Sequence, residues 1–309
     1  MTEVKIMTAN DIKKILLIGS GTMGQQIAGQ CALFGRECLI HTLNDQERQR
    51  AVKGIRESVL APIVKAGMAT PQQAEEALSR ISYISGPGQV PADVDLVSES
   101  VPEDYDLKKK VWSSFAPYLP GHSILTTNTS SLLPSKFKDA CGAPERFLSW
   151  HFHTPVFFQN LVDVMPSPAT DPLYCKILMD FSPMIGQNVV YLENEYPRYL
   201  ANTMFGAIIR SALKLYLDGA ASYEDIDKAW MGVRKADMGP FGLMDKVGLD
   251  IEIHVLSQDP TQAKAVEMIG KMVNQGKLGV KSGQGFYSYP NPKFEEPGFI
   301  VRPRPVPEL

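Results

Sequence analysis

The sequence predicts an α/β protein in which a doubly wound parallel sheet precedes a smaller all-α domain. Three observations carry this prediction. The apolar run Ile15–Ile18 leads into a glycine-rich turn and a helix, short apolar runs alternate with helical segments up to about residue 192, and only helical patterns follow Tyr196. Continuous apolar runs are typical of parallel strands that are covered on both faces, and their alternation with helices indicates crossover units.

The glycine-rich turn is the hexapeptide GSGTMG at residues 19–24. Gly19 permits the tight bend, Gly21 lets a ligand approach the backbone, and Gly24 allows the helix to pack against its strand. The N-terminus of that helix would offer free N–H groups to a pyrophosphate. The turn therefore predicts a Rossmann-type dinucleotide site, and an ordinary strand-to-helix turn is the alternative.

Later apolar runs supply the remaining strands, near residues 37–43, 81–84, 96–98, 123–126, 146–151, 161–164 and 189–192. A helical stretch over 45–81, interrupted by Pro62, Gly67 and Pro71, predicts a pair of helices inserted after the second strand. We expect a dinucleotide-binding domain at 1–194 and a helical substrate and dimerisation domain at 195–309. The latter predicts helices at 198–218, 222–230, 242–258 and 262–275, before a proline-rich tail that packs on the surface or on a partner.

Composition excludes several classes of function. The net charge of −3 and pI near 6.0 argue against nucleic acid or an anionic membrane as partner. The four cysteines lack CxxC spacing, so we expect reduced thiols and no metal site. No targeting segment or membrane-length apolar run is evident, and we expect a cytoplasmic protein with a small-molecule substrate.

Four polar residues suggest where the chemistry lies. Ser130 follows a predicted strand, at the edge where open α/β sheets bind ligands. His151 ends another strand and can exchange a proton near neutral pH. Asp163 stands among apolar residues, where a carboxylate needs a partner such as histidine, and Asn202 opens the helical region with an amide. Each residue alone is equally compatible with a structural role.

Taken in order, the motifs resemble those of the L-3-hydroxyacyl-CoA dehydrogenase family, which includes hydroxybutyryl-CoA, L-gulonate, L-carnitine and diketo-ester dehydrogenases. The resemblance spans nearly the whole chain. It is carried by GSGTMG (19–24), ESVPEDYDLKKK (99–110), NTSSLLP (128–134), HFHTPV (151–156), LVDV (161–164), YPRYLAN (196–202), DGAASYEDIDKA (218–229), MGPFGLMDKVGLD (238–250) and GKLGVKSGQGFYSY (276–289).

The resemblance implies a role for each matching residue. His151 falls on the family's catalytic base, and Asp163 falls on the glutamate that orients this base. Ser130 and Asn202 match the residues that hold the reacting oxygen. The expected cofactor-binding residues are Gly19, Gly21, Thr22, Met23, Gly24, Thr42, Glu99, Lys108 and Asn128.

Several positions depart from the family pattern. His153 stands where the family often has phenylalanine, and on a strand it faces the same way as His151, which makes it a rival base. Arg198 replaces the glycine of the family's PGF turn, and it would contact an acidic substrate or remain solvated. Phe157 and Phe158 replace smaller residues and could narrow the substrate pocket.

Thr42 stands where an NAD site usually has an acidic residue at the end of the second strand, with Asn44 and Asp45 just beyond. Three arginines near this strand could instead favour NADP: Arg36, Arg48 and Arg50. Since no arginine sits in the turn itself, we expect NAD, with NADP as the alternative.

The sequence thus predicts an NAD(P)-dependent oxidoreductase that interconverts a 3-hydroxyacyl substrate and its 3-keto form. A basic rim for a CoA thioester would come from Lys53, Arg56 and Lys65, which could equally form a solvated helix face. Small free hydroxy acids and keto or diketo esters are alternative substrates. A catalytically silent dinucleotide-binding protein is the alternative of a different class. We expect a homodimer formed through the helical domain.

Overall fold

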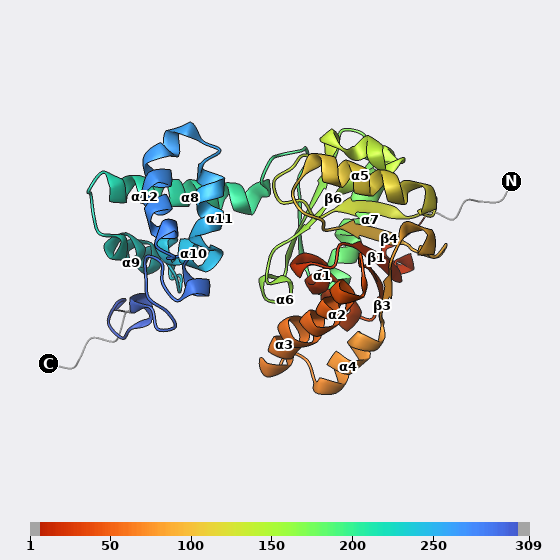
Figure 1. Cartoon of the computed structure of the whole chain (residues 1–309), viewed down its shortest axis with the longest axis horizontal. Helices are drawn as coiled ribbons and strands as arrows, with labels where there is room; N and C mark the ends of the chain where they lie inside the picture. The colour runs from red at the N-terminus through yellow and green to blue at the C-terminus, as the bar shows by residue number, and fades with distance from the viewer. Residues whose placement is uncertain (1–6, 302–309) are drawn as a thin grey trace, which may run out of the picture. The chain divides into compact units, whose positions relative to one another are not determined.

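A computed structural model describes residues 7–301. Eight strands form one sheet in the order β3-β2-β1-β4-β5-β6-β7-β8. Figure 1 labels four of them, β1, β3, β4 and β6. Their bounds are β1 Lys14–Ile18, β2 Glu37–His41, β3 Ile81–Ile84, β4 Leu96–Glu99, β5 Ile124–Thr127, β6 Phe147–Phe152, β7 Leu161–Pro166 and β8 Asn188–Tyr191. The predicted doubly wound sheet is confirmed, with one strand pair that departs from the parallel arrangement.

That pair is β6 and β7, which run antiparallel. Only residues 153–160 connect them, including the short helix α6 (Val156–Gln159). A parallel crossover needs a dozen or more residues, so this link can only turn the chain back beside itself. The hairpin places His151 directly opposite Asp163 in the register.

Strand β1 lies at the point where the strand order reverses, between β2 and β4. Its side chains alternate between two cores. Ile15 and Leu17 belong to one buried cluster, and Leu16 and Ile18 belong to the cluster on the other face. This explains why the run carries no polar residue. Ligands of open α/β sheets bind beyond the carboxyl ends of the strands at such a reversal.

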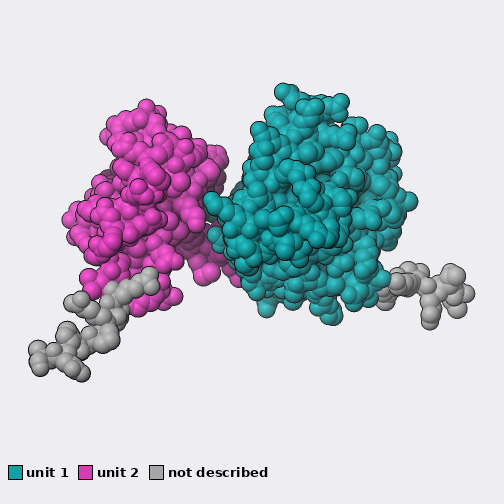
Figure 2. Space-filling model, turned by 90° about the horizontal axis from the view of Figure 1, so that it is seen from below, with its two compact units in different colours: residues 1–199 teal, residues 200–309 magenta. Residues whose placement is uncertain are grey.

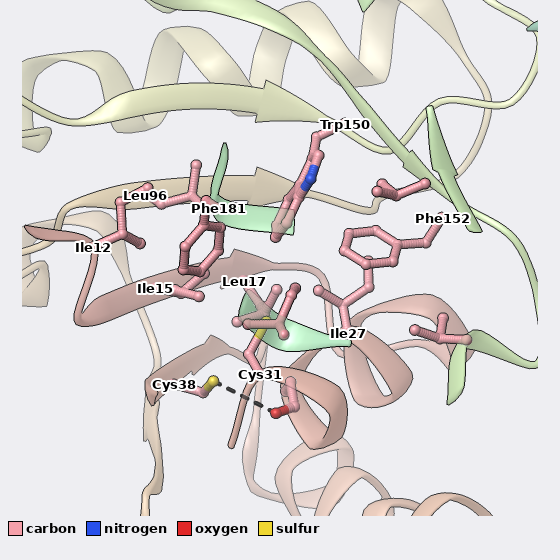
Figure 3. Close-up of a cluster of buried hydrophobic side chains, with 14 of the residues drawn as sticks. Ile12, Ile15, Leu17, Ile27, Cys31, Cys38, Leu96, Trp150, Phe152 and Phe181 are labelled. Atoms are coloured by element: carbon pink, nitrogen blue, oxygen red, sulfur yellow. Dashed lines mark hydrogen bonds between the residues drawn. The ribbon is translucent and has the colours of Figure 1, made fainter. Parts of the chain in front are cut away.

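Figure 3 shows part of the first cluster, where Trp150 lies near Phe152 and Phe181. The Trp150 ring packs edge-on against Phe152 at 4.5 Å between centroids, and its indole N–H donates to the Ser182 hydroxyl at 2.9 Å. Burying a large apolar side chain contributes about 1.5–3 kcal/mol. Trp150 and Phe152, the residues directly before and after His151, therefore anchor β6 in the core.

Helices α1 (Thr22–Leu33), α5 (Tyr105–Phe115) and α7 (Pro172–Phe181) connect the strands. The insertion after β2 consists of α2 (Asp45–Gly54), a π-helical segment at Ile55–Leu60, α3 (Ala61–Lys65) and α4 (Pro71–Ser79). Pro62 does not interrupt the first helical run, which continues from α2 through the π-helical segment into α3 without a break. The break falls at Gly67, which has a positive φ of 71°.

The chain divides into two compact units, residues 1–199 and 200–309 (Figure 2). The division predicted from the sequence lies slightly earlier, after residue 194. The helices from this point on are α8 (Tyr199–Leu217), α9 (Tyr223–Arg234), α10 (Pro240–Val247), α11 (Leu249–Leu256) and α12 (Ala263–Asn274). The single helix predicted over 242–258 is wrong, since Gly248 adopts a φ of 108° and separates α10 from α11.

The described part of the proline-rich tail packs on the second unit itself. Phe294 and Phe299 are buried in its apolar core, and Lys293 pairs with Glu224 at 2.6 Å. Residues 302–309 of the predicted tail lie outside the described range. Within residues 7–301, none of the helices combines the length and the apolar character that crossing a membrane requires.

Candidate active site

The glycines of the turn between β1 and α1 differ in the space around them. Gly19 has a φ of 118°, and a Cβ there would lie 2.8 Å from the Ser100 carbonyl oxygen. A Cβ on Gly24 would lie 1.9 Å from the Gly19 oxygen, whereas one on Gly21 would meet no atom within 4 Å. Two glycines are thus required by packing, and the third leaves the start of α1 open to a ligand. Thr22 and Met23 form the first turn of this helix.

Glu99 ends β4 and forms a buried ion pair with Lys108 of α5. The Lys108 Nζ lies 2.7 Å from Glu99 Oε1, and the two side chains are 1% and 0% exposed. Glu99 also accepts hydrogen bonds from the Val101 N–H and the Thr127 hydroxyl, and Lys108 also donates to the Val101 carbonyl. These contacts hold the loop after β4 beside Gly19. Both residues are thus occupied by protein partners.

Ser130 lies just beyond β5 and is bound by a carboxylate that the sequence analysis did not single out. The Ser130 hydroxyl donates to Glu103 Oε1 at 2.9 Å, and the Thr129 hydroxyl donates to Glu103 Oε2 at 2.7 Å. Burial raises the pKa of Glu103, but Lys108 and these hydrogen bonds outweigh it and bring the pKa below its usual value. Glu103 is therefore ionised, and it orients the Ser130 turn.

The predicted base His151 and its predicted partner Asp163 are in contact. His151 Nδ1 lies 2.9 Å from Asp163 Oδ2, and the residues are 4% and 1% exposed. Asp163 is shorter than the family's glutamate by one methylene, and direct pairing of β6 with β7 closes that gap. An ionised Asp163 can only accept a hydrogen bond, so Nδ1 of His151 carries the proton that it donates. The Nε2 of His151 is then the basic nitrogen.

Electrostatics keep this pair in the form that a base needs. Burial lowers the pKa of His151 below its ordinary 6.5, and this outweighs the opposite effects of Asp163 and Glu103. Burial raises the pKa of Asp163, yet the hydrogen bonds from His151 and His153 bring it below its ordinary value of 3.8. At neutral pH the imidazole is neutral and the carboxylate is charged.

His153 shares the same carboxylate oxygen. Its Nε2 lies 2.8 Å from Asp163 Oδ2, and its side chain is 15% exposed. The three side chains offer ligand atoms within 4.8 Å of one another, the donor set of a divalent metal site, and hydrogen bonds connect them here. Each histidine directs one ring nitrogen at Asp163 and keeps the other free of it, Nε2 in His151 and Nδ1 in His153. The His151 side chain is the more deeply buried of the two, 5% exposed against 15% for His153.

Tyr199 is a further residue at the site that the sequence analysis did not single out. Its ring stacks on the His151 imidazole at 4.3 Å between centroids with an angle of 8°, and its hydroxyl donates to the Thr129 carbonyl at 2.8 Å. Tyr199 and Arg198 both have a positive φ, of 56° and 68°. Arg198 thus keeps the glycine-like backbone of the family's turn, and such a conformation costs about 1–2 kcal/mol in a residue with a side chain.

Three other predicted residues lie at different places. Asn128 is buried, and its side chain accepts the Phe152 N–H at 2.8 Å, which ties the end of β5 to β6. Thr42 is buried beyond β2, and its N–H donates to the Ile84 carbonyl. Asn202 stands in the first turn of α8, in the second unit.

Two of the three residues of the predicted basic rim, Lys53 and Arg56, lie beside acidic neighbours. Arg56 pairs with Glu75, and Lys53 lies 3.8 Å from Glu57. This favours the solvated helix face over a dedicated anion site. Phe157 and Phe158 line a hollow of about 160 Å³ together with residues of α1 and the helical insertion.

Comparison with known proteins identifies the family. Residues 14–196 match the family described as 3-hydroxyacyl-CoA dehydrogenase, NAD binding domain, and residues 199–289 match its C-terminal domain. The chain belongs to the 3-hydroxyacyl-CoA dehydrogenase family. It is accordingly an oxidoreductase that acts on CH–OH groups, with an NAD-binding first domain.

The mitochondrial hydroxyacyl-coenzyme A dehydrogenase of Sus scrofa is 32% identical to this chain. The match covers 90% of this chain and 91% of the Sus scrofa protein. Among solved structures, a diketoreductase studied for dual catalysis of dicarbonyl compounds is 33% identical with a TM-score of 0.85, covering 90% of this chain and 99% of its own. The (S)-3-hydroxybutyryl-CoA dehydrogenase of Ralstonia eutropha is 28% identical with a TM-score of 0.80, at the same coverages.

Proposed function

We propose that this protein interconverts a 3-hydroxyacyl-CoA thioester and its 3-keto form with NAD(H), and that His151 is the base. The observation that carries the proposal is the neutral, buried His151 held by Asp163 in the register of β6 and β7. The glycine-rich turn supports NAD(H) as the cofactor, because its open backbone at Gly21 fits a pyrophosphate. When bound, the nicotinamide accepts or returns a hydride.

In the oxidation direction, the Nε2 of His151 takes the proton of the substrate hydroxyl. Asp163 stabilises the imidazolium that results and retains the proton on Nδ1. The stacked ring of Tyr199 limits rotation of the imidazole out of this orientation. Ketone reduction reverses these steps, with His151 returning the proton.

The family resemblance assigns Ser130 to the reacting oxygen. In the structure the Ser130 hydroxyl donates its proton to Glu103, so its oxygen would accept a hydrogen bond from the substrate hydroxyl, and it would have to turn away from Glu103 to donate to the ketone. The assignment of Asn202 to the same oxygen rests on the family resemblance. We assign Glu99 and Lys108 to the support of the loop beside Gly19, since protein atoms already occupy their polar groups. They would act on the cofactor site through this loop.

The test is His151→Ala, assayed by NAD reduction with 3-hydroxybutyryl-CoA. Loss of general base catalysis is expected to lower kcat by about 10²- to 10⁴-fold. Binding of NADH, followed by its fluorescence, should persist, since His151 is absent from the glycine-rich turn. Turnover close to that of the unaltered protein would contradict the assignment. Absence of activity in the unaltered protein on every substrate would favour the silent dinucleotide-binding alternative.

A second candidate substrate is a keto or diketo ester, favoured by the similarity to the diketoreductase structure. A panel of 3-hydroxyacyl-CoA thioesters, free hydroxy acids and diketo esters, each tested with NAD(H) and NADP(H), separates the candidates by kcat/KM. The homodimer formed through the helical domain and the cytoplasmic location stay predictions. Gel filtration at the monomer mass would contradict the dimer.

A further inference from the structure

The end of β2 has no acidic residue at the position where NAD enzymes usually carry one. Thr42 occupies this position, its side chain is neutral, and it is buried. The usual acid accepts a hydrogen bond from the 2′-hydroxyl of the adenosine ribose and also repels the 2′-phosphate of NADP. Unless another residue supplies this charge, the glycine-rich turn binds the pyrophosphate without distinguishing the two cofactors.

Glu47 brings a carboxylate to this place from the first turn of α2. Its Oε2 accepts the Leu43 N–H at 3.0 Å, immediately after Thr42, and lies 3.4 Å from the Ser20 hydroxyl. Ser20 belongs to the glycine-rich turn itself. Asn44 caps α2 by accepting the Glu47 N–H at 2.9 Å, which fixes the turn of helix that carries the carboxylate. Glu47 therefore spans the gap between the end of β2 and the turn after β1.

We propose that Glu47 supplies the carboxylate that binds the adenosine ribose and makes the protein select NAD(H) over NADP(H). This inference rests on the proposed function as an NAD-dependent dehydrogenase. Helix capping alone would account for the contact with Leu43, since an acid in the first turn often binds a backbone N–H. It does not account for the contact with Ser20. Both contacts use Oε2, so Oε1 is the oxygen that would bind a ribose hydroxyl.

The nearby arginines support the same preference. Arg36 precedes β2, at the opposite end of the strand from Thr42, and its guanidinium lies over the Phe181 ring at 5.4 Å. Arg48 lies over the Tyr83 ring at 5.5 Å. Arg50 is exposed on α2, three positions after Glu47, and it is the arginine that could serve a 2′-phosphate if the inference is wrong.

The experiment measures dissociation constants of NADH and NADPH by fluorescence titration, with no substrate present. Glu47→Gln keeps the size of the side chain and an oxygen for the Leu43 N–H, and it removes only the charge. We expect this change to raise the dissociation constant of NADH by roughly 10- to 100-fold, which corresponds to the loss of one hydrogen bond to a charged group. NADPH binding should be unchanged or tighter, because a repulsive charge is lost.

Asp45→Asn is the matched control, since it removes an equal charge from the same turn of α2 without touching Ser20 or Leu43. It should leave both dissociation constants close to those of the unaltered protein. Unchanged NADH affinity in Glu47→Gln, or an equal loss in both variants, would overturn the inference. So would NADPH preference that disappears in Arg50→Gln.

The failure of the proposed function has a different signature. If the unaltered protein binds neither dinucleotide, the proposed function is wrong, and the inference falls with it. If it binds NADH normally and Glu47→Gln changes nothing, only the inference fails. Thermal unfolding of each variant checks the fold, and Glu47→Asp provides a second variant that keeps the charge and shortens its reach, for which partial loss of NADH affinity is expected.

Discussion

Glu99 and Asp163 are two carboxylates of the first unit that are almost fully buried, but they pair with different kinds of side chain. Glu99 at the end of β4 pairs with the ammonium of Lys108, whereas Asp163 on β7 lies between the imidazoles of His151 and His153. A lysine ammonium balances the carboxylate with a charge of its own, so the first pair holds a loop. Imidazoles gain and lose protons near neutral pH, so the second centre can take part in proton transfer. The type of partner, rather than the degree of burial, therefore distinguishes the structural carboxylate Glu99 from Asp163, which we assign to proton transfer.

The largest expected effect is on catalysis, in Asp163→Asn. The neutral amide cannot stabilise the imidazolium of His151 and can reverse its tautomer, so kcat should fall by about 10²- to 10⁴-fold. Asp163→Glu, which introduces the residue usual in the family, is the matched control and should retain most turnover. Steady-state kinetics measure both. Equal activity of the Asn and Glu variants would show that the charge at Asp163 does not serve catalysis.

Lys108→Met should act on stability. It leaves Glu99 buried without its counter-charge, and the free energy of unfolding should fall by about 3–5 kcal/mol. Urea denaturation measures this, with the exposed Lys109→Met on the same helix as control. A loss no larger than that of the control would remove the distinction between the two carboxylates.

The pH dependence of oxidation follows from the lowered pKa of His151. The base must be neutral, so kcat/KM for oxidation should stay high as the pH falls toward 6.5 and decline only as it passes through the lower pKa of the buried imidazole. Ketone reduction needs the protonated form and should gain as the pH falls. A profile of kcat/KM against pH tests both. An acidic limb above pH 6.5 would contradict the neutral base.

His153→Phe should give the smallest effect. It removes one donor from Asp163 and the electrostatic effect by which His153 lowers the pKa of His151, so that pKa should rise and the acidic limb should move to higher pH by no more than about one unit. Turnover above that limb should persist. Loss of turnover like that of His151→Ala would instead identify His153 as the base.

Much of the fold follows from local sequence patterns. The apolar runs located all eight strands, because strands covered on both faces are mostly apolar, and their buried polar residues lie mainly toward the carboxyl ends, as with Glu99 of β4 and His151 of β6. The single helix expected over 242–258 failed at Gly248, since apolar periodicity continued through a residue that adopts a left-handed backbone. The antiparallel β6–β7 pair depends on the length of its connection, which the alternation of strands and helices does not reveal.

The sequence predicted those residues of the candidate site whose roles are known from the motifs of the family. His151, Asp163 and Ser130 stand on motifs whose order in the chain matches the family. Glu103 and Tyr199 carried no comparable signal, although Glu103 belongs to a matching motif and Tyr199 follows Arg198 in another. Their roles at the site depend on contacts with Ser130 and His151 that form only when β5, β6 and the start of α8 come together.

The sequence by itself determined the glycine-rich turn, the doubly wound sheet, the helical second part and the positions of His151 and Asp163, because these depend on local geometry and on residues within short motifs. Only the tertiary structure decided that Asp163 serves two histidines and that Glu47 reaches Ser20. Both contacts join segments whose distance apart is set by packing of strands and helices, and no spacing along the chain encodes that distance.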